Sequence, residues 1–226
     1  FHLLGRKAPM HIYGPKGIKE AITLLLKLAK SWTNYPLHFH ELTEKSSVCL
    51  LAEDEIEVYT IPLKHRVYTN GFLFRETPKD RKINAEAVEQ YQIDHSQMRN
   101  LKKRKDVVNV HGNNIANQEV THDPRPPKSY AFCSDTAYHP EMVDLIQRVD
   151  VLYHEATFLN DHQVLAQKTF HSTAQQAAQI AKDAHVKHLI LGHYSSRYKD
   201  LTQFQSEAAE VFPYVDLAFD GYSLEF

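Results

Sequence analysis

Three side chains that can bind a metal ion each lie two residues after a short, largely apolar run. They are His65, Asp135 and His193. Apolar runs of this length are typical of buried strands, and the end of a strand is where the backbone turns and releases a polar side chain. Imidazole nitrogen and carboxylate oxygen are both ligands of zinc, and a carboxylate can bridge two cations. These positions therefore indicate a hydrolytic metal site whose parts are dispersed along the chain.

The residues after His193 are typical of a phosphate-binding turn. The chain continues through Ser195 and Ser196 to Arg197. Small hydroxyl side chains and a guanidinium group are hydrogen-bond donors suited to phosphate oxygens. We therefore take Ser195, Ser196 and Arg197 as candidate substrate-binding residues.

Two further sites carry polar groups in comparable settings. His154 and Glu155 come directly after an expected strand at 151–153, and His171 precedes an alanine-rich helix expected at 173–184. Ser172 or Thr173 would be a natural N-cap of that helix, and the free N–H groups of a helix N-terminus favour anions such as phosphate. His154, Glu155 and His171 are therefore candidate catalytic residues.

Each candidate also has a plain structural interpretation. A single histidine after a strand, such as His65, is more often hydrogen-bonded within the structure than bound to a metal. Ser134, Asp135 or Thr136 could be the N-cap of a helix expected at 139–149.

Strands and helices alternate along most of the chain, which favours an α/β layer fold. An amphipathic helix is expected at 17–32, and a closing hairpin of 215–219 and 222–226 around Asp220-Gly221. The other expected strands are 9–13, 37–42, 47–52, 56–63, 71–75, 130–133, 151–153 and 186–191.

The segment Thr77–Lys128 departs from this alternation. It is polar and charge-rich, and it contains the basic run Lys102, Lys103, Arg104 and Lys105. A long insertion of this kind is typical of an arm that projects from a core or is disordered, although such a run is commonly a solvated helix face. We therefore divide the chain into a first core part (1–76), an inserted arm (77–128) and a second core part (129–226).

Composition sets limits on the function. The chain has 226 residues, 42% of them hydrophobic, and a formal net charge of −2. Nucleic-acid binding would therefore depend on local patches rather than on overall charge. The two cysteines, Cys49 and Cys133, are far apart, which suits a reducing cytoplasm. No apolar run approaches membrane-spanning length, and no signal peptide is recognisable.

Five motifs together resemble a known family. In chain order they are Pro62-Leu63-Lys64-His65-Arg66, Ser134-Asp135-Thr136, His154-Glu155-Ala156-Thr157-Phe158, His171-Ser172-Thr173-Ala174 and Gly192-His193-Tyr194-Ser195-Ser196-Arg197-Tyr198. This set resembles ribonuclease Z, a family of metallo-β-lactamase-fold endonucleases that mature the 3′ end of transfer RNA. The resemblance extends over essentially the whole chain.

The resemblance implies an αββα sandwich, a homodimer and precursor tRNA as the substrate. It also implies two zinc ions, with His65 on one ion, His193 on the other and Asp135 bridging both. His171 would act on the leaving oxygen of the scissile phosphate, with His154 and Glu155 orienting neighbouring groups. The inserted arm 77–128 would grip the tRNA, and cleavage would leave a 3′-hydroxyl on the tRNA and a 5′-phosphate on the trailer.

One motif of the family, His-x-His-x-Asp-His, does not occur in the sequence. The chain opens on Phe1-His2-Leu3-Leu4, which suggests a start within a helix or core element and a fold that is incomplete at its N-terminus. With three predicted ligands for two ions, we expect weak zinc binding and little activity from these 226 residues. Two alternatives stay open: another phosphodiesterase or esterase of the same fold, or a non-catalytic RNA-binding fragment.

Overall fold

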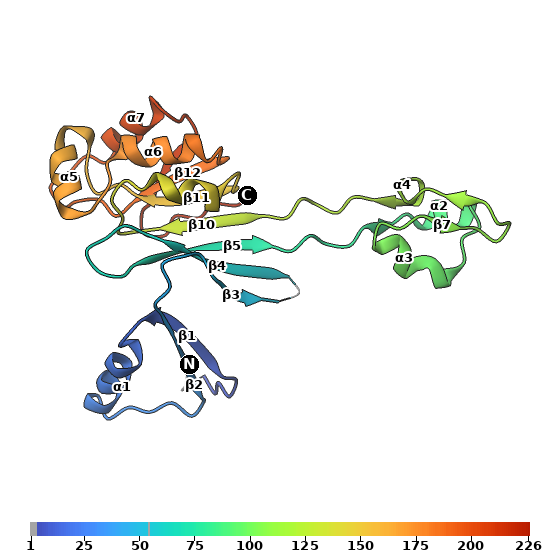
Figure 1. Ribbon diagram of the computed structural model, residues 1–226, viewed down its shortest axis with the longest axis horizontal. Helices are drawn as coiled ribbons and strands as arrows, with labels where there is room; N and C mark the ends of the chain where they lie inside the picture. Colours follow the sequence, from blue (N-terminus) through green and yellow to red (C-terminus); the bar gives the residue numbers. More distant parts are fainter. Residues whose placement is uncertain (1–3, 54) are drawn as a thin grey trace. The chain divides into compact units, whose positions relative to one another are not determined.

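The computed structural model describes residues 4–53 and 55–226 and divides into two compact units (Figure 1). Unit 1 comprises Phe1–Cys49, Tyr59–Leu73 and Tyr130–Phe226; unit 2 comprises Leu50–Val58 and Phe74–Ser129. The expectation that the chain begins within a helix or core element falls on residues 1–3, which lie outside the described residues. None of the described helices combines the length and the apolar character that crossing a membrane requires.

A seven-stranded sheet has the strand order β13-β12-β11-β10-β5-β4-β3. Its strands, in that order, are Val215–Leu217, His188–Gly192, Val151–Glu155, Ser129–Cys133, Asn70–Glu76, Ile56–Pro62 and Cys49–Ala52. The four strands from β10 to β13 pair in parallel. Helices α5 (Gln163–Thr169) and α6 (Ala174–Asp183) connect β11 to β12, and α7 (Thr202–Ala209) connects β12 to β13, because parallel neighbours need a crossover connection. Their carboxyl ends therefore lie at one edge of the sheet.

The main core forms where α6 and α7 cover the parallel strands (Figure 1). Five buried residues of α6, four of them alanines, give the helix a narrow face that can lie close to the sheet. Thr173 begins the helix as predicted: its hydroxyl accepts a hydrogen bond from the N–H of Gln176, whose side chain bonds back to the Thr173 N–H. This cap fixes the point where the chain leaves the sheet edge, directly after His171.

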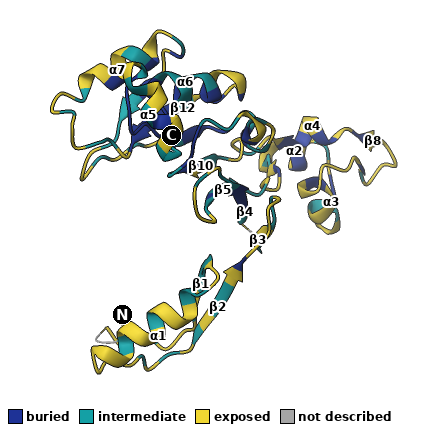
Figure 2. Ribbon diagram, turned by 60° about the vertical axis from the view of Figure 1, so that its left-hand side comes forward, coloured by how far each residue is buried: buried dark blue, intermediate teal, exposed yellow. Residues whose placement is uncertain are grey.

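The first elements of unit 1 form a smaller layer. Strands β1 (Met10–Pro15) and β2 (Leu37–Leu42) pair in parallel, and α1 (Ile18–Leu28) connects them. Gly14 lies close to Ile18, at the start of α1. Helix α1 buries none of its residues, as its exposed colouring in Figure 2 shows.

Unit 2 is folded and has a core of its own, so of the two alternatives for this segment, a projecting arm or a disordered one, the disordered one is wrong. The core residues are Ala87, Val88, Ile93, Leu101, Val107, Ile115 and Val120. The elements are β6 (Lys82–Ile83), α2 (Ala85–Gln90), a 3₁₀ turn His95–Gln97, α3 (Met98–Lys102), β7 (Val107–Val108), β8 (Asn114–Ile115), α4 (Asn117–Val120) and β9 (Thr121–His122). Strand β6 pairs with β9 and β7 with β8, both antiparallel.

Two expectations about elements are wrong. Val215–Leu217 pairs in parallel with β12, so the predicted closing hairpin does not form, and Tyr222–Phe226 is not a strand. The helix expected at 139–149 is the 3₁₀ helix Pro140–Ile146, with His139 as its N-cap. The cap interpretation of Ser134, Asp135 and Thr136 is therefore wrong too.

Candidate active site

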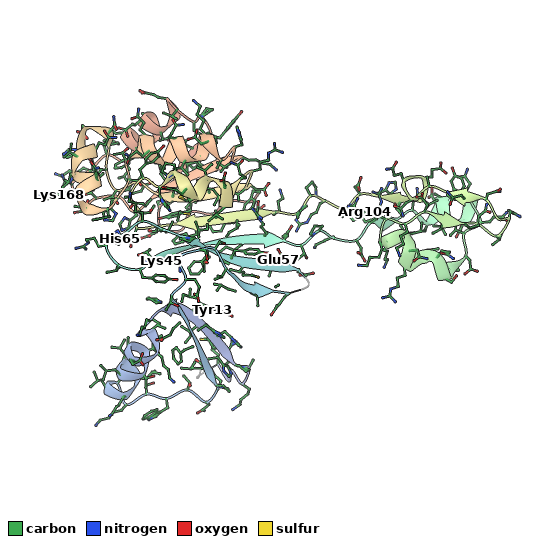
Figure 3. All side chains as sticks on the ribbon, in the orientation of Figure 1. Tyr13, Lys45, Glu57, His65, Arg104 and Lys168 are labelled. Carbon is green, nitrogen blue, oxygen red and sulfur yellow. The ribbon has the colours of Figure 1, made fainter. Side chains whose placement is uncertain are left out.

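The predicted residues gather at the carboxyl edge of the parallel strands. Asp135 follows β10, Glu155 is the last residue of β11 and His193 is the first residue after β12. These strands are adjacent and in register, with Glu155 paired to Gly192. Side chains at the carboxyl ends of neighbouring parallel strands face a common crevice. His65 lies in the loop between β4 and β5 (Figure 3).

The backbone at this edge is held in unfavourable conformations. Asp135, Phe170 and His193 have φ angles of 57°, 61° and 60°, in the left-handed region that residues with a side chain rarely adopt. Phe170 comes directly before His171. Strained residues of this kind persist where the surrounding structure over-determines them, and they cluster at functional sites.

Asp135, His171 and His193 form a compact set of possible metal ligands. One ligand atom from each lies within 4.8 Å of the others. Nε2 of His193 is 3.1 Å from Oδ1 of Asp135, and the rings of His171 and His193 have centroids 5.3 Å apart. Two imidazoles and a carboxylate are the donor set that zinc and similar divalent cations take. The residues present therefore fit a metal ion.

Glu155 is the anchor of this cluster. Its side chain is fully buried, and its carboxylate accepts four hydrogen bonds. Oε1 accepts from the N–H of Thr136 at 3.0 Å and from Nδ1 of His171 at 2.7 Å. Oε2 accepts from the N–H and the hydroxyl of Thr157, at 3.0 and 2.7 Å. When all the lone pairs of a buried carboxylate accept hydrogen bonds in this way, those bonds offset the free-energy cost of burying its charge.

These bonds decide which ring nitrogens are free. Because the Thr157 hydroxyl donates to Glu155, its oxygen accepts from Nδ1 of His193, 2.9 Å away. His171 likewise donates from Nδ1 to Glu155. Nε2 of both rings therefore faces the sheet edge, where that of His193 lies 3.1 Å from Oδ1 of Asp135. Fixing the tautomer through the second nitrogen is how proteins orient ligand and catalytic histidines.

The same contacts shift the pKa values of the pair. Burial alone would raise the pKa of Glu155, but the hydrogen bonds from His171 and Thr157 outweigh it and leave that pKa lowered. The hydrogen bond to Glu155 raises the pKa of His171, and burial only partly opposes it. The pair therefore favours an ionised carboxylate beside a protonated imidazole.

His65 lies beside this cluster but outside the compact ligand set. Its Nδ1 bonds to the carbonyl oxygen of Phe170 at 3.0 Å, and its ring centroid lies 5.3 Å from that of His171. A backbone carbonyl on Nδ1 leaves Nε2 as the nitrogen that could bind a metal.

His154 was expected after β11 but is part of it, as is Glu155. Its ring is fully buried, and Nδ1 bonds to the carbonyl of Glu155 at 2.7 Å. Burial lowers its pKa, and Nε2 has no hydrogen-bond partner among the described residues. The structure therefore places His154 in the core, where it supports the strand end that carries Glu155.

The turn after His193 borders the same site. Nε of Arg197 donates to the Ser195 hydroxyl at 3.2 Å, and the guanidinium lies 5.2 Å from the ring centroid of Phe158. That ring is 6.3 Å from the ring of His171. Ser196 is exposed in the same turn. A cation held in this way is placed for an anionic substrate.

The basic run belongs to unit 2. All four residues are exposed at the end of α3. Two of them are paired with acids: Lys103 with Asp80 at 2.9 Å and Arg104 with Asp123 at 3.1 Å. Lys102 and Lys105 are therefore the members of the run best placed to meet phosphate.

The sequence interpretation missed the threonines of the site. Thr136 and Thr157 are buried, and both bond to Glu155. The signal was present, because each stands beside a candidate residue in a motif. The positions of the two threonines did not reveal that both would donate hydrogen bonds to the carboxylate of Glu155.

A cavity of about 580 Å³ opens beside His171. Lys64, Tyr138 and Phe170 contribute a cation and two aromatic rings, and the side chains of three glutamines add amide groups. Such a lining suits a group that is partly flat and partly polar.

Comparisons with known proteins agree with this arrangement. Residues 120–194 match the family model described as the β-lactamase superfamily domain. The chain is 41% identical over 218 residues to a ribonuclease Z of Bacteroides thetaiotaomicron, covering 96% of this chain and 69% of that protein. It is also 41% identical over 223 residues to a ribonuclease Z of Cytophaga hutchinsonii, covering 98% and 71%.

Solved structures show the same fold. Human tRNase Z, short form, superposes with a TM-score of 0.57 at 21% identity, covering 84% of this chain and 61% of that one. The metallo-β-lactamase-fold protein YhfI of Bacillus subtilis gives 0.60 at 17% identity, covering 97% and 65%. The predicted metallo-β-lactamase fold is confirmed, and with relatives this similar in sequence the chain belongs to the ribonuclease Z family.

Proposed function

We propose that this protein is a metal-dependent endoribonuclease that removes the 3′ trailer from precursor tRNA. The observation that carries the proposal is the Glu155–His171 pair beside Asp135 and His193, in a chain that belongs to the ribonuclease Z family. Cleavage would leave a 3′-hydroxyl on the tRNA and a 5′-phosphate on the trailer. The name of the human protein of the same fold, tRNase Z, suggests tRNA as the class of substrate.

Zinc is the metal we propose. Asp135 and His193 would hold it with their carboxylate oxygens and Nε2, and His65 would contribute Nε2 from the neighbouring loop. When bound, the metal would lower the pKa of water and polarise the phosphate. The motif His-x-His-x-Asp-His does not occur among the 226 residues, so we expect these residues alone to bind zinc weakly and to cleave precursor tRNA negligibly.

His171 is the proposed proton donor. Glu155 fixes its Nδ1 and favours its protonated form. The Nε2 proton would pass to the 3′-oxygen of the tRNA as the bond between that oxygen and phosphorus breaks. Glu155 would stay ionised and stabilise the imidazolium until that transfer.

Other side chains would position the RNA. Arg197, held by Phe158 and Ser195, would offset negative charge that develops on the phosphate. Unit 2 would contact the tRNA backbone through Lys102 and Lys105. A homodimer and a cytoplasmic location stay predictions, and sedimentation would test the former.

A small phosphodiesterase or esterase of the same fold is the second candidate. It would use the same strand-end residues but would have no need of unit 2. Comparing rates on a precursor tRNA and on bis(p-nitrophenyl) phosphate separates the two. Faster turnover of the small ester, unaffected by changes in unit 2, would favour the second candidate.

The direct test uses an extended chain, defined as these 226 residues joined to an upstream segment that carries the His-x-His-x-Asp-His motif. With zinc, it should cut a precursor tRNA once, at the base of the trailer. The tRNA fragment should be oxidised by periodate, and the trailer should lose a terminal phosphate to phosphatase. A 2′,3′-cyclic phosphate on the tRNA fragment would refute the proposed chemistry.

A further inference from the structure

Three histidines outside the proposed active site lie on one face of the β1–β2 layer. His11 is directly opposite His38 in the parallel register, and Tyr13 is opposite His40. Side chains two residues apart on a strand point to the same face. His11, His38 and His40 are therefore neighbours across two paired strands, and Ile12 and Phe39 lie on the other face.

The rings already meet in pairs. Nδ1 of His11 and Nε2 of His40 are 2.9 Å apart, and their rings are nearly parallel with centroids 5.1 Å apart. The centroid of the His38 ring lies 5.0 Å from the centroid of the His11 ring. His11 and His38 are exposed, and His40 is partly so. Solvent can therefore reach the nitrogens of the cluster.

The contact between His11 and His40 has a specific chemical meaning. Two imidazole nitrogens at hydrogen-bond distance share one proton, so at least one of them offers a lone pair aimed at the other. A divalent cation can take the place of that proton. Zinc–nitrogen bonds of about 2.0–2.1 Å in tetrahedral geometry would place the two nitrogens about 3.3 Å apart, so they would separate by only a few tenths of an ångström.

The pattern of the strands supplies the third ligand. His38 and His40 form a His-x-His pair on one strand, and His11 joins from the neighbouring strand. Two nitrogens meet in the present side-chain positions, and the exposed His38 ring, now stacked on His11, would have to rotate to supply the third. Three imidazoles with water in the fourth position are a known set of zinc ligands.

We propose that His11, His38 and His40 form a second, solvent-accessible site for a late first-row divalent cation such as Zn²⁺ or Cu²⁺. Imidazole suits these ions, and copper binds nitrogen ligands most tightly among them. The site is independent of the proposed endoribonuclease activity. It needs none of the residues at the carboxyl edge of the seven-stranded sheet.

The test uses Cu²⁺ as the probe in the 226-residue chain with D135N and H193Q, which disable the other cluster. We expect one bound Cu²⁺ per chain, with electron paramagnetic resonance showing coupling to about three imidazole nitrogens. Cu²⁺ should also displace Zn²⁺ that was bound to the same site beforehand. His40→Gln should weaken Cu²⁺ binding at least about tenfold in competition with a chelator, since even loss of a residue that only orients a ligand costs this much.

His95→Gln is the matched control, because His95 is exposed in unit 2, outside the cluster, and its loss should change nothing. His38→Asn is a second, independent variant at an exposed position, and circular dichroism of each variant reports folding. Failure to bind Cu²⁺, or binding that neither His40→Gln nor His38→Asn weakens in folded protein, would overturn the proposal. Either result would leave the proposed RNA cleavage untouched.

Discussion

Each unit of the molecule contains a buried charged side chain that makes several hydrogen bonds, and the two are used differently. In unit 1, Glu155 accepts bonds from two threonines and from His171. In unit 2, the guanidinium of Arg81 is 7% exposed; it bonds to Asp123 and Thr121 at 2.5 Å and also to the Thr121 carbonyl. Both charges are compensated, as burial requires.

The difference lies in what the partners can do. Arg81, directly before β6, bonds to Thr121 of β9 and to Asp123 just after it, and these contacts hold parts of unit 2 together. Glu155 instead fixes His171 through Nδ1, and through Thr157 it fixes Nδ1 of His193. A buried charge therefore contributes to structure in both units, but only in unit 1 does it orient histidines of the candidate site.

The largest expected effect is at Glu155. Glu155→Gln puts an amide N–H₂ against a donor of Thr157 or His171 and removes the charge that favours protonated His171. We expect single-turnover cleavage of precursor tRNA by the extended chain to fall about 10²–10⁴-fold, as for loss of a general acid.

The matched control is Glu207→Gln. Glu207 also accepts two backbone N–H groups in unit 1, from Asn160 and Gln175. Its replacement should lower thermal stability and leave the rate at saturating zinc unchanged. Equal losses of rate in the two variants would mean that Glu155 acts through stability alone.

Next in size is Arg81 in unit 2. Arg81→Met leaves the buried Thr121 without its partner, which we expect to cost unit 2 about 1–3 kcal/mol, while the 68% exposed Asp123 is solvated by water. Hydrogen exchange should show faster amide exchange in β6 and β9 and little change in β10–β12. Arg104→Met, which removes an exposed cation from the same Asp123, should cost no more than about 1 kcal/mol. Equal losses of stability in the two variants would show that the burial of Arg81 does not increase its contribution to unit 2.

A smaller effect is expected from the basic run. Replacing Lys102 and Lys105 by alanine should reduce the slope of log affinity for tRNA against log salt by about 1 to 2, since each phosphate contact contributes about 0.9 or less. Lys103→Ala is the control, because Lys103 is paired with Asp80. An unchanged slope in the double variant would remove this run from the RNA-binding surface.

The smallest effect concerns pH and stability. The hydrogen bond from Tyr222 lowers the pKa of Asp216, and His188 adds to this. Because the pKa is lowered in the folded state, the stabilisation is present above the unfolded value of about 3.9 and is lost as pH falls through the folded value. Asp216→Asn should cost less than about 1 kcal/mol at neutral pH, since the group is partly exposed, and nothing in strong acid. Equal costs at both pH values in urea denaturation would contradict this.

Much of the fold could be predicted from the pattern of apolar runs. The strands at 37–42, 130–133 and 186–191, and the capped helix at 173–184, correspond to observed elements within a few residues. The hairpin prediction was wrong because Asp220-Gly221 indicates a turn but does not determine which strand pairs with Val215–Leu217. The free edge of β12, reached through α7, paired with Val215–Leu217 instead.

The candidate site could be predicted in its residues but not in its connections. Strand ends in the sequence identify Asp135 and His193, because parallel strands place their carboxyl ends together. The local sequence pattern does not reveal that the Thr157 hydroxyl bonds to both Glu155 and His193. Thr157 and His193 are 36 positions apart in the chain. The proposed roles of these residues stay predictions until they are tested.

The most direct test measures zinc content and single-turnover cleavage of precursor tRNA together, in the extended chain with and without His171→Ala. If His171 is a proton donor held by Glu155, the rate should fall about 10²–10⁴-fold while zinc content stays nearly constant. Zinc lost in parallel with the rate would make His171 a metal ligand, and an unchanged rate would remove it from the chemistry; either result would contradict the account.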